Sequence, residues 1–321
     1  MNDQAFLSRA RGCMIGLAIG DAMGDIGRSD LYRNRYGIVT DMYAGVKSTD
    51  DTEFAILTAR TLVDCGGQLT SAAVTAAWEK YILGQGGMFD RGGKPLYGAV
   101  ENLKRGLLPP QTGLYNVMNN DDGAAMRIAP VGILCSGDPQ RAAVMAEIDA
   151  QMSHAGDGIA AAQAVAASVA VATAGGSAAE VVQAGLAQIP AASWLGYSMA
   201  KMMAICDQAG SIEAAWQDLH NVFWTPVHSA CEEALPQIYG IYRLTGGDFR
   251  RGMFWASNFG RDADTIAAVV GAMAGGRQGI EAIPAEWVEK ARQPSGVCLR
   301  FSAQEDVLDL ADQLVKLAAQ S

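Results

Sequence analysis

Four short clusters of acidic and polar residues stand where helices are expected to begin or end, and their side chains are well suited to binding a ligand. They are residues 20–25 (GDAMGD), 48–53 (STDDTE), 153–158 (SHAGDG) and 260–265 (GRDADT). An aspartate at a helix start accepts hydrogen bonds from free backbone N–H groups and complements the helix dipole. Taken one at a time, each cluster is explained more simply as a helix cap than as a binding site.

The second and fourth clusters are harder to explain as caps, because each places two carboxylates within one helical turn. Asp50 and Asp51 are adjacent, and one residue separates Asp262 from Asp264. A cap needs a single acceptor, so a second charge beside it adds repulsion and little stabilisation. Hard cations such as Mg²⁺, Mn²⁺ or Ca²⁺ bind carboxylate, hydroxyl and water oxygens, and a bound cation removes that repulsion.

Together the two pairs predict an oxygen-ligated metal site built from the first and last thirds of the chain. The chain has only three histidines, none at metal-ligand spacing, which argues against a zinc site. Within the second cluster we expect Ser48 to cap the helix and Thr49 to supply a hydroxyl ligand.

The overall composition is that of a folded, acidic, helical protein. The 321 residues carry a formal net charge of −10, with 50% hydrophobic and 18% charged residues. The low charged fraction is typical of closely packed helices and excludes an intrinsically disordered chain. The acidic balance argues against an extended nucleic-acid-binding surface and against binding to an anionic membrane.

The cysteines and the N-terminal residues indicate a reducing compartment. The six cysteines are scattered and show neither Cys-x-x-Cys nor zinc-finger spacing, which is typical of buried thiols. Residues 1–25 lack a basic leader joined to an apolar run, so we expect no signal peptide. The most apolar stretch, residues 159–174, is shorter than the roughly 18 residues of a membrane span. We expect a soluble, cytoplasmic protein with no membrane partner.

Helical periodicity dominates the chain, and strand-like alternation of Val, Ile and Thr is nearly absent. Helices are expected over residues 8–24, 51–67, 70–87, 142–154, 157–174, 177–188, 193–208, 211–222, 229–244, 248–258, 264–274 and 303–319. One further short helix is expected inside the Gly-, Pro- and Asn-rich segment 89–122, a long surface segment. With no repeat or linker, residues 1–321 predict one compact all-α domain, a helical bundle.

The stretches GDAMGD, TDDTE, GAAMRIAPVGIL, SHAGDG and GRDADTIAAVVGAMAGG occur in a characteristic order and spacing. This set resembles the ADP-ribosylglycohydrolase family, which includes the hydrolases that reverse arginine and serine ADP-ribosylation and the one that reactivates dinitrogenase reductase. The resemblance spans about residues 12–276, and the pair of TDDT and D-x-D-T motifs is its most specific part.

The resemblance implies an all-α fold with a binuclear Mg²⁺ centre, or Mn²⁺ in some members, inside a cleft. Matched by position, the implied metal ligands are Thr49, Asp50, Asp51, Asp262, Asp264 and Thr265. In such a site the metals hold the ribose hydroxyls and a water, and the glycosidic bond at the anomeric carbon is hydrolysed. The implied partner is an ADP-ribosylated protein or a ribosylated small molecule.

The resemblance also implies where the substrate is held. The residues assigned to substrate binding are Asp21, Arg28, Gly123, Ala124, Met126, Ser153 and His154. Small residues at positions 123–125 allow the backbone to approach a diphosphate and the distal ribose, although a turn entering a helix explains them equally well. For His154 we favour contact with the ligand, or support of it, over a role as general base.

The main departure from the family pattern is Arg28, which stands by count where many members carry a Glu that gates the metal. The catalytic candidates are therefore Asp25, with Asp30 as an alternative to it, Glu53, and the metal-ligating Asp51 and Asp262. Arg28 itself suits contact with an anionic group of the substrate. The segment before Gly123 also departs, with NNDDG in place of the usual Asn-Gly, and Arg261 replaces a common Gly.

Three functions are consistent with these residues. The first is a Mg²⁺-dependent glycohydrolase that releases ADP-ribose from a modified protein or small molecule. The second is a hydrolase of a smaller N-riboside, suggested by the missing Glu and the altered segment before Gly123. The third is a catalytically silent ADP-ribose-binding protein, suggested by Arg28. Because all six implied metal ligands are present, we favour the first.

Overall fold

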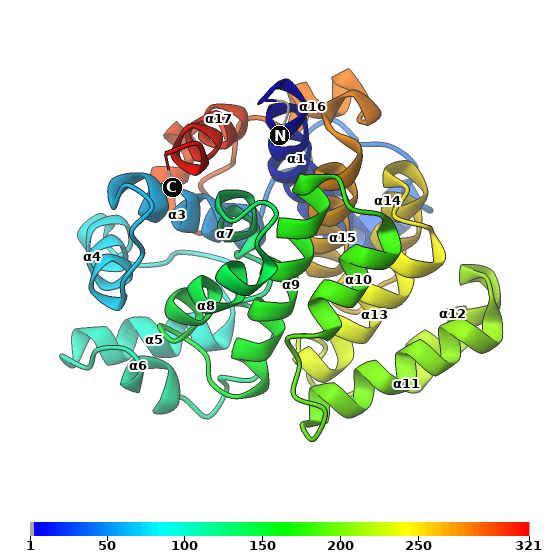
Figure 1. Ribbon diagram of the computed structural model, residues 1–321, viewed down its shortest axis with the longest axis horizontal. Coiled ribbons are helices and arrows are strands. Elements are labelled where there is room, and N and C mark those ends of the chain that lie inside the picture. Colours follow the sequence, from blue (N-terminus) through cyan, green and yellow to red (C-terminus); the bar gives the residue numbers. More distant parts are fainter. Residues whose placement is uncertain (1–2, 321) are drawn as a thin grey trace.

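Two long helices far apart in the sequence form the centre of the molecule. In this computed structural model, which describes residues 3–320, α1 (Asp3–Arg28) packs along α15 (Ala263–Gln278), as Figure 1 shows. Four glycines of α1, one turn apart, face α15, and they are Gly12, Gly16, Gly20 and Gly24. A Cβ at any of them would lie 2.1–2.3 Å from a carbonyl oxygen of α15, so the two backbones are in direct contact. The C-terminal end of α1 therefore lies beside the N-terminal end of α15.

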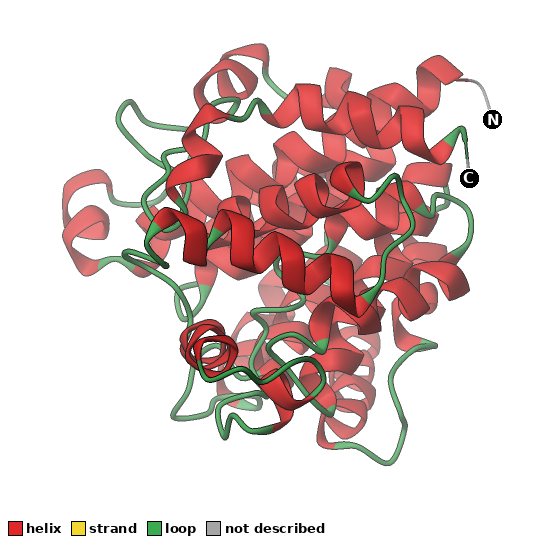
Figure 2. Cartoon of the chain, turned by 90° about the vertical axis from the view of Figure 1, so that its left-hand side faces the viewer, coloured by secondary structure: helices red, strands yellow, loops and turns green. Residues whose placement is uncertain are grey.

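The remaining helices pack around this pair. They are α2 (Asp30–Tyr36), α3 (Asp50–Asp64), α4 (Ser71–Tyr81), α5 (Lys94–Lys104), α6 (Gln111–Leu114), α7 (Ala129–Leu134), α8 (Pro139–Ala150), α9 (Asp157–Ala174), α10 (Ala178–Leu186), α11 (Trp194–Ala209), α12 (Ile212–Asn221), α13 (Cys231–Leu244), α14 (Phe249–Ser257), α16 (Ala285–Ala291) and α17 (Val307–Ala318), with 3₁₀ turns η1 (Leu83–Gln85), η2 (Ile280–Ala282) and η3 (Arg300–Gln304). Figure 2 shows only helices and loops, and the described residues contain no strand beyond an isolated antiparallel bridge between Asp121 and Ala230. The predicted all-α fold is confirmed.

Helix α9 is the most apolar segment and belongs to the core. By length and composition alone it is long and apolar enough to cross a membrane, but 72% of that window is buried inside the protein. It packs against α7, α8, α10 and α15. Its Ala-rich surface is apolar all round, which is typical of a helix enclosed by other helices.

Most of the predicted helices are present to within a few residues, and the range 157–174 coincides with α9. Local capping explains this agreement. At the start of α4 the hydroxyl of Thr70 accepts a hydrogen bond from Ala73 N (3.1 Å), and Gly175, with a φ of 92°, ends α9. The expectation of one helix in residues 89–122 is wrong, because α5 and α6 both lie there. Three short helices, α2, α7 and α16, were not predicted.

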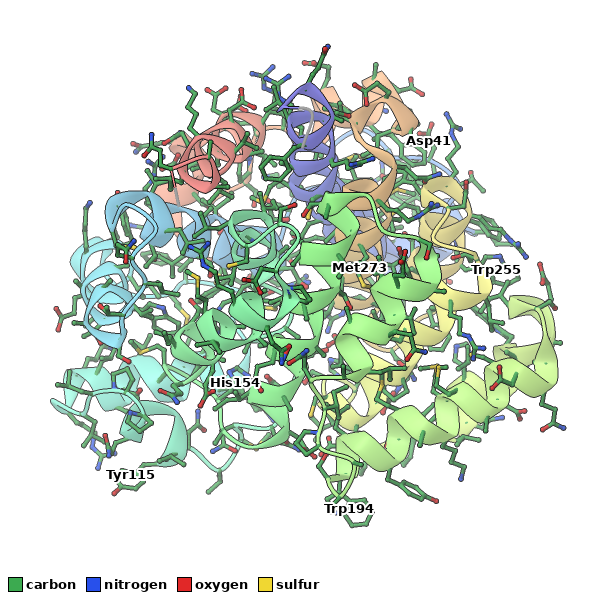
Figure 3. All side chains as sticks on the ribbon, viewed as in Figure 1. Asp41, Tyr115, His154, Trp194, Trp255 and Met273 are labelled. Atoms are coloured by element: carbon green, nitrogen blue, oxygen red, sulfur yellow. The ribbon has the colours of Figure 1, made fainter. Side chains whose placement is uncertain are left out.

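Large side chains divide between the interior and the surface. Met273 of α15 lies in the interior, whereas Tyr115 and Trp194 lie on the outside of the molecule (Figure 3). His154, in the loop between α8 and α9, is buried although it is polar. A buried histidine requires hydrogen-bond partners, and those of His154 lie at the edge of the candidate active site.

Candidate active site

The start of α3 is capped by a side chain from another helix. Thr49 is the N-cap residue but makes no side-chain capping bond of its own. Instead Asp21 of α1 accepts hydrogen bonds from the backbone N–H groups of Thr49 (2.7 Å) and Thr52 (3.1 Å). It also accepts hydrogen bonds from both threonine hydroxyls, at 2.6 Å and 2.5 Å respectively. Because Asp21 satisfies these groups, Asp50 and Asp51 are left available for a ligand.

This arrangement changes the expected roles of three residues. The assignment of Ser48 as the cap is wrong, because its hydroxyl oxygen instead accepts a hydrogen bond from Ser295 N (2.8 Å). Thr49 directs its hydroxyl at Asp21 and does not line the main pocket. Asp21 is fully buried behind the pocket wall, where it supports the start of α3.

A pocket of about 340 Å³ opens where the ends of α1, α3 and α15 meet. Its acidic lining residues are Asp50, Asp51, Asp121, Asp122, Asp262 and Asp264. Its basic lining residues are Arg28, Arg91, Lys94 and His228. Gly92, Gly93, Gly123, Met126 and Thr265 also line it. The pocket therefore brings together residues from the first, middle and last thirds of the chain, with an acidic floor and basic groups around it.

Three carboxylate oxygens in this pocket are buried and unpaired. Asp51 Oδ1, Asp122 Oδ2 and Asp264 Oδ1 have no hydrogen-bond partner among residues 3–320. An unpaired buried acceptor costs roughly 1–3 kcal/mol, so these atoms mark a place for a ligand that carries positive charge. Oxygens of Asp21, Asp51 and Asp264 lie within 4.8 Å of one another, close enough for a single cation to bridge them. This donor set fits a hard divalent cation.

The buried carboxylates have raised pKa values. Burial raises the pKa of Asp21 to about 7. Burial and repulsion from Asp264 together raise the pKa of Asp262 to about 7. Burial, with repulsion from Asp264 and Asp21, also raises the pKa values of Asp50 and Asp51 well above their ordinary value. A cation bound here favours the ionised carboxylates and so opposes these shifts.

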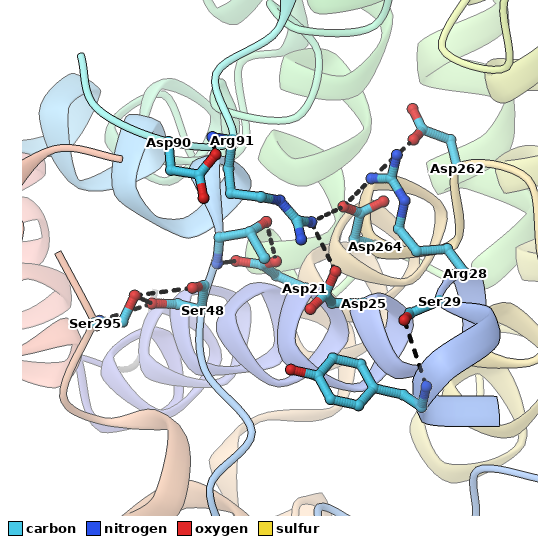
Figure 4. Close-up of polar contacts among 12 residues, drawn as sticks. Asp21, Asp25, Arg28, Ser29, Ser48, Asp90, Arg91, Asp262, Asp264 and Ser295 are labelled. Atoms are coloured by element: carbon cyan, nitrogen blue, oxygen red, sulfur yellow. Dashed lines mark hydrogen bonds and ion pairs between the residues drawn. The ribbon is translucent and has the colours of Figure 1, made fainter. Parts of the chain in front are cut away.

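Two arginines neutralise part of the cluster (Figure 4). Arg28, the last residue of α1, contacts Asp264 and places Nη1 3.2 Å from Asp262 Oδ1. Arg91, in the loop before α5, places Nη2 2.7 Å from Asp25 Oδ1 and 3.3 Å from Asp264 Oδ2. Arg91 has a φ of 75°, a left-handed conformation that is uncommon outside glycine and is often found at functional sites. In this structure Arg28 thus meets carboxylates of its own chain.

Sequence reasoning missed several residues of the pocket, among them Arg91, Asp122 and His228. Arg91 and His228 lie in loops without a recognisable motif, and Asp122 was noticed only as part of the unusual NNDDG segment. His228 Nε2 lies 2.9 Å from Arg28 Nη2 and 3.3 Å from Asp262 Oδ1. Burial and repulsion from Asp262 raise the pKa of Asp122 well above its ordinary value. His228 and Asp122 therefore bear on the charge around Asp262, whereas Arg91 contacts Asp25 and Asp264.

A buried chain of hydrogen bonds positions Asp121 at the edge of the pocket. His154 Nε2 lies 2.7 Å from Asp121 Oδ1, and His154 Nδ1 lies 2.8 Å from Ser153 Oγ. Burial lowers the pKa of His154, so its ring is neutral near pH 7. Because a carboxylate accepts hydrogen bonds, Nε2 donates to Asp121 and Nδ1 accepts from Ser153. Neither His154 nor Ser153 lines the pocket, so both support it from behind.

The glycine-rich stretch forms one wall of the pocket. Gly123 and Met126 line it, whereas Ala124 is buried and does not. A Cβ at Gly123 would lie 3.0 Å from Asp121 Oδ1, which leaves little room for a side chain. The buried guanidinium of Arg127 donates to Gly123 O (3.0 Å) and fixes this turn from below. The wall is therefore smooth and rigid.

The remaining catalytic candidates lie at different distances from the pocket. Glu53 accepts hydrogen bonds from the backbone N–H groups of Val297 (2.9 Å), Cys298 (2.9 Å) and Leu299 (2.6 Å), so it anchors that segment and does not line the pocket. Asp25 lines a second cavity of about 320 Å³ on the other side of Arg91. Only Asp51 and Asp262 among the four lie in the main pocket.

The fold and the site together define a class of protein. It is all-α, with a buried acidic cluster at the ends of three helices. The ADP-ribosylglycohydrolase family profile matches residues 2–321, and the chain belongs to this family.

Individual relatives agree with this membership. An uncharacterised protein of Archaeoglobus fulgidus is 29% identical over 292 residues, which cover 87% of this chain and 90% of the relative. The ADP-ribosylarginine hydrolase Tri1 of Pseudomonas putida is 26% identical over 328 residues, covering 98% of this chain and 81% of that protein. A solved structure described as an ADP-ribosylglycohydrolase-related protein complex superposes with a TM-score of 0.68 at 23% identity, covering 98% of this chain and 99% of its own. That similarity supports the fold.

Proposed function

We propose that this chain is a divalent-cation-dependent glycohydrolase that cleaves the glycosidic bond at the anomeric carbon of an ADP-ribosyl group. Membership of the family supports a hydrolase that acts on ADP-ribosyl groups. The observation that carries the cation dependence is the pair of unpaired, buried oxygens, Asp51 Oδ1 and Asp264 Oδ1, in a pocket with an acidic floor. Their burial without a partner is costly unless a cation binds between them.

Asp51 and Asp264 would hold the cation, with Asp21 behind them. Of the ligand set expected from the sequence, Asp50, Thr265 and Asp262 line the same pocket, and Thr49 donates its hydroxyl hydrogen to Asp21. A bound Mg²⁺ or Mn²⁺ would lower the pKa of a water and would hold the ribose hydroxyl groups through their oxygen lone pairs. The resemblance implies two Mg²⁺ ions, and the number that this chain binds is the subject of the further inference below.

One wall of the pocket, at residues 91–94, suits an anionic substrate group. Arg91 and Lys94 line it and supply positive charge, and the backbone of Gly92 and Gly93 leads into the N-terminus of α5. Free N–H groups at a helix start and nearby cations are complementary to phosphate oxygens. We therefore place one phosphate of the substrate along this wall and the ribose ring toward Asp51, and we keep residues 123–125 as the expected contact for the rest of the diphosphate and the distal ribose.

For the leaving group we propose an arginine side chain of an ADP-ribosylated protein as the first substrate to test, because the relative from Pseudomonas putida is described as an ADP-ribosylarginine hydrolase. A smaller N-riboside is the alternative substrate that the sequence left open. We further propose a cytoplasmic location, no membrane partner and no extended nucleic-acid-binding surface, as expected from the composition.

A catalytically silent ADP-ribose-binding protein is the second candidate function. The contact between Arg28 and Asp264 favours it, because it occupies one oxygen of a carboxylate that a two-metal site needs. We rank it second, since the unpaired oxygens of Asp51 and Asp264 remain on the other side of that contact.

A hydrolysis assay separates these functions. The purified chain is incubated with an ADP-ribosylarginine peptide, an ADP-ribosylserine peptide and a small N-riboside, each with Mg²⁺, Mn²⁺ or EDTA, and products are separated by chromatography. We expect release of ADP-ribose from a peptide with either metal, none with EDTA, and none from Asp51→Asn. Tight ADP-ribose binding with no turnover of any substrate would establish the silent binding protein instead.

A further inference from the structure

We propose that Arg28 permanently fills one half of the acidic cluster, so that the chain binds a single divalent cation and keeps the Arg28 guanidinium as its second positive charge. This inference rests on the proposed cation dependence and assigns the number and place of the ions. We call Asp51, Asp21 and the unpaired oxygen of Asp264 the open side of the cluster. Asp262, Arg28 and His228 are its occupied side.

The occupied side already has its positive charge. Arg28 Nη1 lies 3.2 Å from Asp262 Oδ1, and His228 Nε2 lies 3.3 Å from the same oxygen. Arg28 Nη2 and His228 Nε2 are 2.9 Å apart, so the two side chains hold each other in place. The side chain of Asp262 is only 5% exposed, which makes breaking this contact costly because it would leave a buried charge unpaired.

The negative charge around Asp262 explains why the positively charged guanidinium of Arg28 is retained there. Asp122 is buried and lines the same pocket as Asp262, so two carboxyl groups lie side by side there. Arg28 reaches both Asp262 and Asp264, and it therefore compensates more than one carboxylate. A divalent cation on this side would have to displace a guanidinium that is held by three side chains.

The open side differs in each of these respects. Within residues 3–320 no arginine, lysine or histidine forms an ion pair with Asp51, and Arg28 and Arg91 contact only the Oδ2 atom of Asp264. Asp264 Oδ1 and Asp51 Oδ1 are buried and unpaired. One carboxylate oxygen from each of Asp21, Asp51 and Asp264 lies within 4.8 Å of the other two, which suits one cation. A cation can therefore bind on the open side without displacing any basic side chain.

Charge reversal at position 28 gives the sharpest test. Arg28→Glu changes the local charge by the amount that one divalent cation carries, and it removes the group that blocks Asp262. We expect one bound Mn²⁺ per chain in the wild type and two in Arg28→Glu, measured by titration calorimetry and by elemental analysis after gel filtration. The electron paramagnetic resonance signal should change from that of isolated Mn²⁺ to that of a coupled pair.

Matched variants make each outcome decisive. Arg35→Glu makes the same charge change on exposed α2 and should still bind one ion. If Arg28→Glu fails to fold, Arg28→Gln keeps the length and removes the charge, and it should admit a second, weaker ion. Two ions or none in the wild type, or a single ion in both folded Arg28 variants, would overturn the inference. The bound ions are counted without substrate, so the result does not depend on activity. One bound ion in a protein that hydrolyses no substrate would contradict only the proposed glycohydrolase function.

Discussion

The contact between α1 and α15 and the acidic cluster at its end are built by the same two helices in opposite ways. Along the contact, glycines bring backbone against backbone, and the surrounding side chains are apolar and buried. At the cluster, the same helices place Asp21, Asp262 and Asp264 in the interior, and one oxygen of Asp264 has no partner. The first region stabilises the fold, and the second holds groups that are unfavourable until a ligand binds.

This difference indicates where stability was exchanged for function. Buried carboxylates with raised pKa values destabilise a metal-free protein, and they persist because the tightly packed helix pair holds them in place. Substitutions in the two regions should therefore have opposite consequences for the metal-free fold.

The largest expected effect is in the helix contact. A Cβ at Gly20 would lie 2.1 Å from Ala267 O, so Gly20→Ala must push the helices apart and should destabilise the protein by at least about 3 kcal/mol. Gly276→Ala is the matched control on α15, because its Cβ would meet only side-chain atoms at 3.4 Å or more. Urea unfolding of both variants measures the difference. Equal stabilities would show that the helices are not in rigid contact.

Removing a carboxylate from the open side of the cluster should stabilise the metal-free protein, whereas Gly20→Ala should destabilise it. Asp51→Asn or Asp264→Asn should weaken Mn²⁺ binding by at least about 100-fold, since a charged ligand is lost. The same variants should raise the melting temperature of the metal-free protein by about 2 °C or more, because a buried repulsion is removed. Asp149→Asn is the control, since Asp149 is buried but paired with Arg127 at 2.7 Å, and it should lower the melting temperature. Destabilisation of the metal-free protein by Asp51→Asn would favour a capping role.

The stability of the metal-free protein should fall as pH rises from about 4 to about 7. In that window the folded protein keeps protons on Asp21 and Asp262, whose pKa values are about 7, while the unfolded chain has released them. Each such group contributes up to about 1.4 kcal/mol per pH unit. Measuring the free energy of unfolding against pH, with EDTA and with saturating Mg²⁺, checks this prediction. The bound cation should make that free energy depend less on pH. A metal-free slope of the opposite sign would contradict buried, protonated carboxylates.

The smallest expected effect concerns the support behind the pocket. His154→Ala removes a hydrogen bond to Asp121 and should raise KM by about tenfold, equivalent to about 1.4 kcal/mol. Mn²⁺ affinity should not change, because His154 lies away from Asp51 and Asp264. His154→Gln, which can still donate to Asp121, should recover part of the loss. Equal loss in both variants would argue against a positioning role.

The sequence predicted the elements that are determined locally. The helix over residues 157–174 carries its own apolar surface and a terminal glycine, and Thr70 caps α4 as expected. Three of the four clusters stand at helix starts as expected, whereas residues 20–25 lie inside α1, which continues to Arg28. Residues of clusters 48–53 and 260–265 line the pocket, and residues of the other two clusters support it from behind. Residue type and spacing along one helix are sufficient for such inferences.

The missed elements depend on long-range contacts or carry no periodic signal. Helix α2 has no buried residue, and all six residues of α7 are buried, so neither shows an amphipathic pattern. Asp21 caps α3 from 28 residues away in the sequence, which no local rule reveals. Arg91 and His228 reach the cluster from loops, and their approach depends on how the whole chain folds.

A crystal soaked in Mn²⁺ and measured for anomalous scattering tests the central claim most directly. We predict a single anomalous peak between Asp51 and Asp264, with Arg28 still in contact with Asp262. A second peak beside Asp262 with Arg28 displaced would contradict the assignment of one cation and one guanidinium. The absence of any peak in the pocket would contradict the metal site itself.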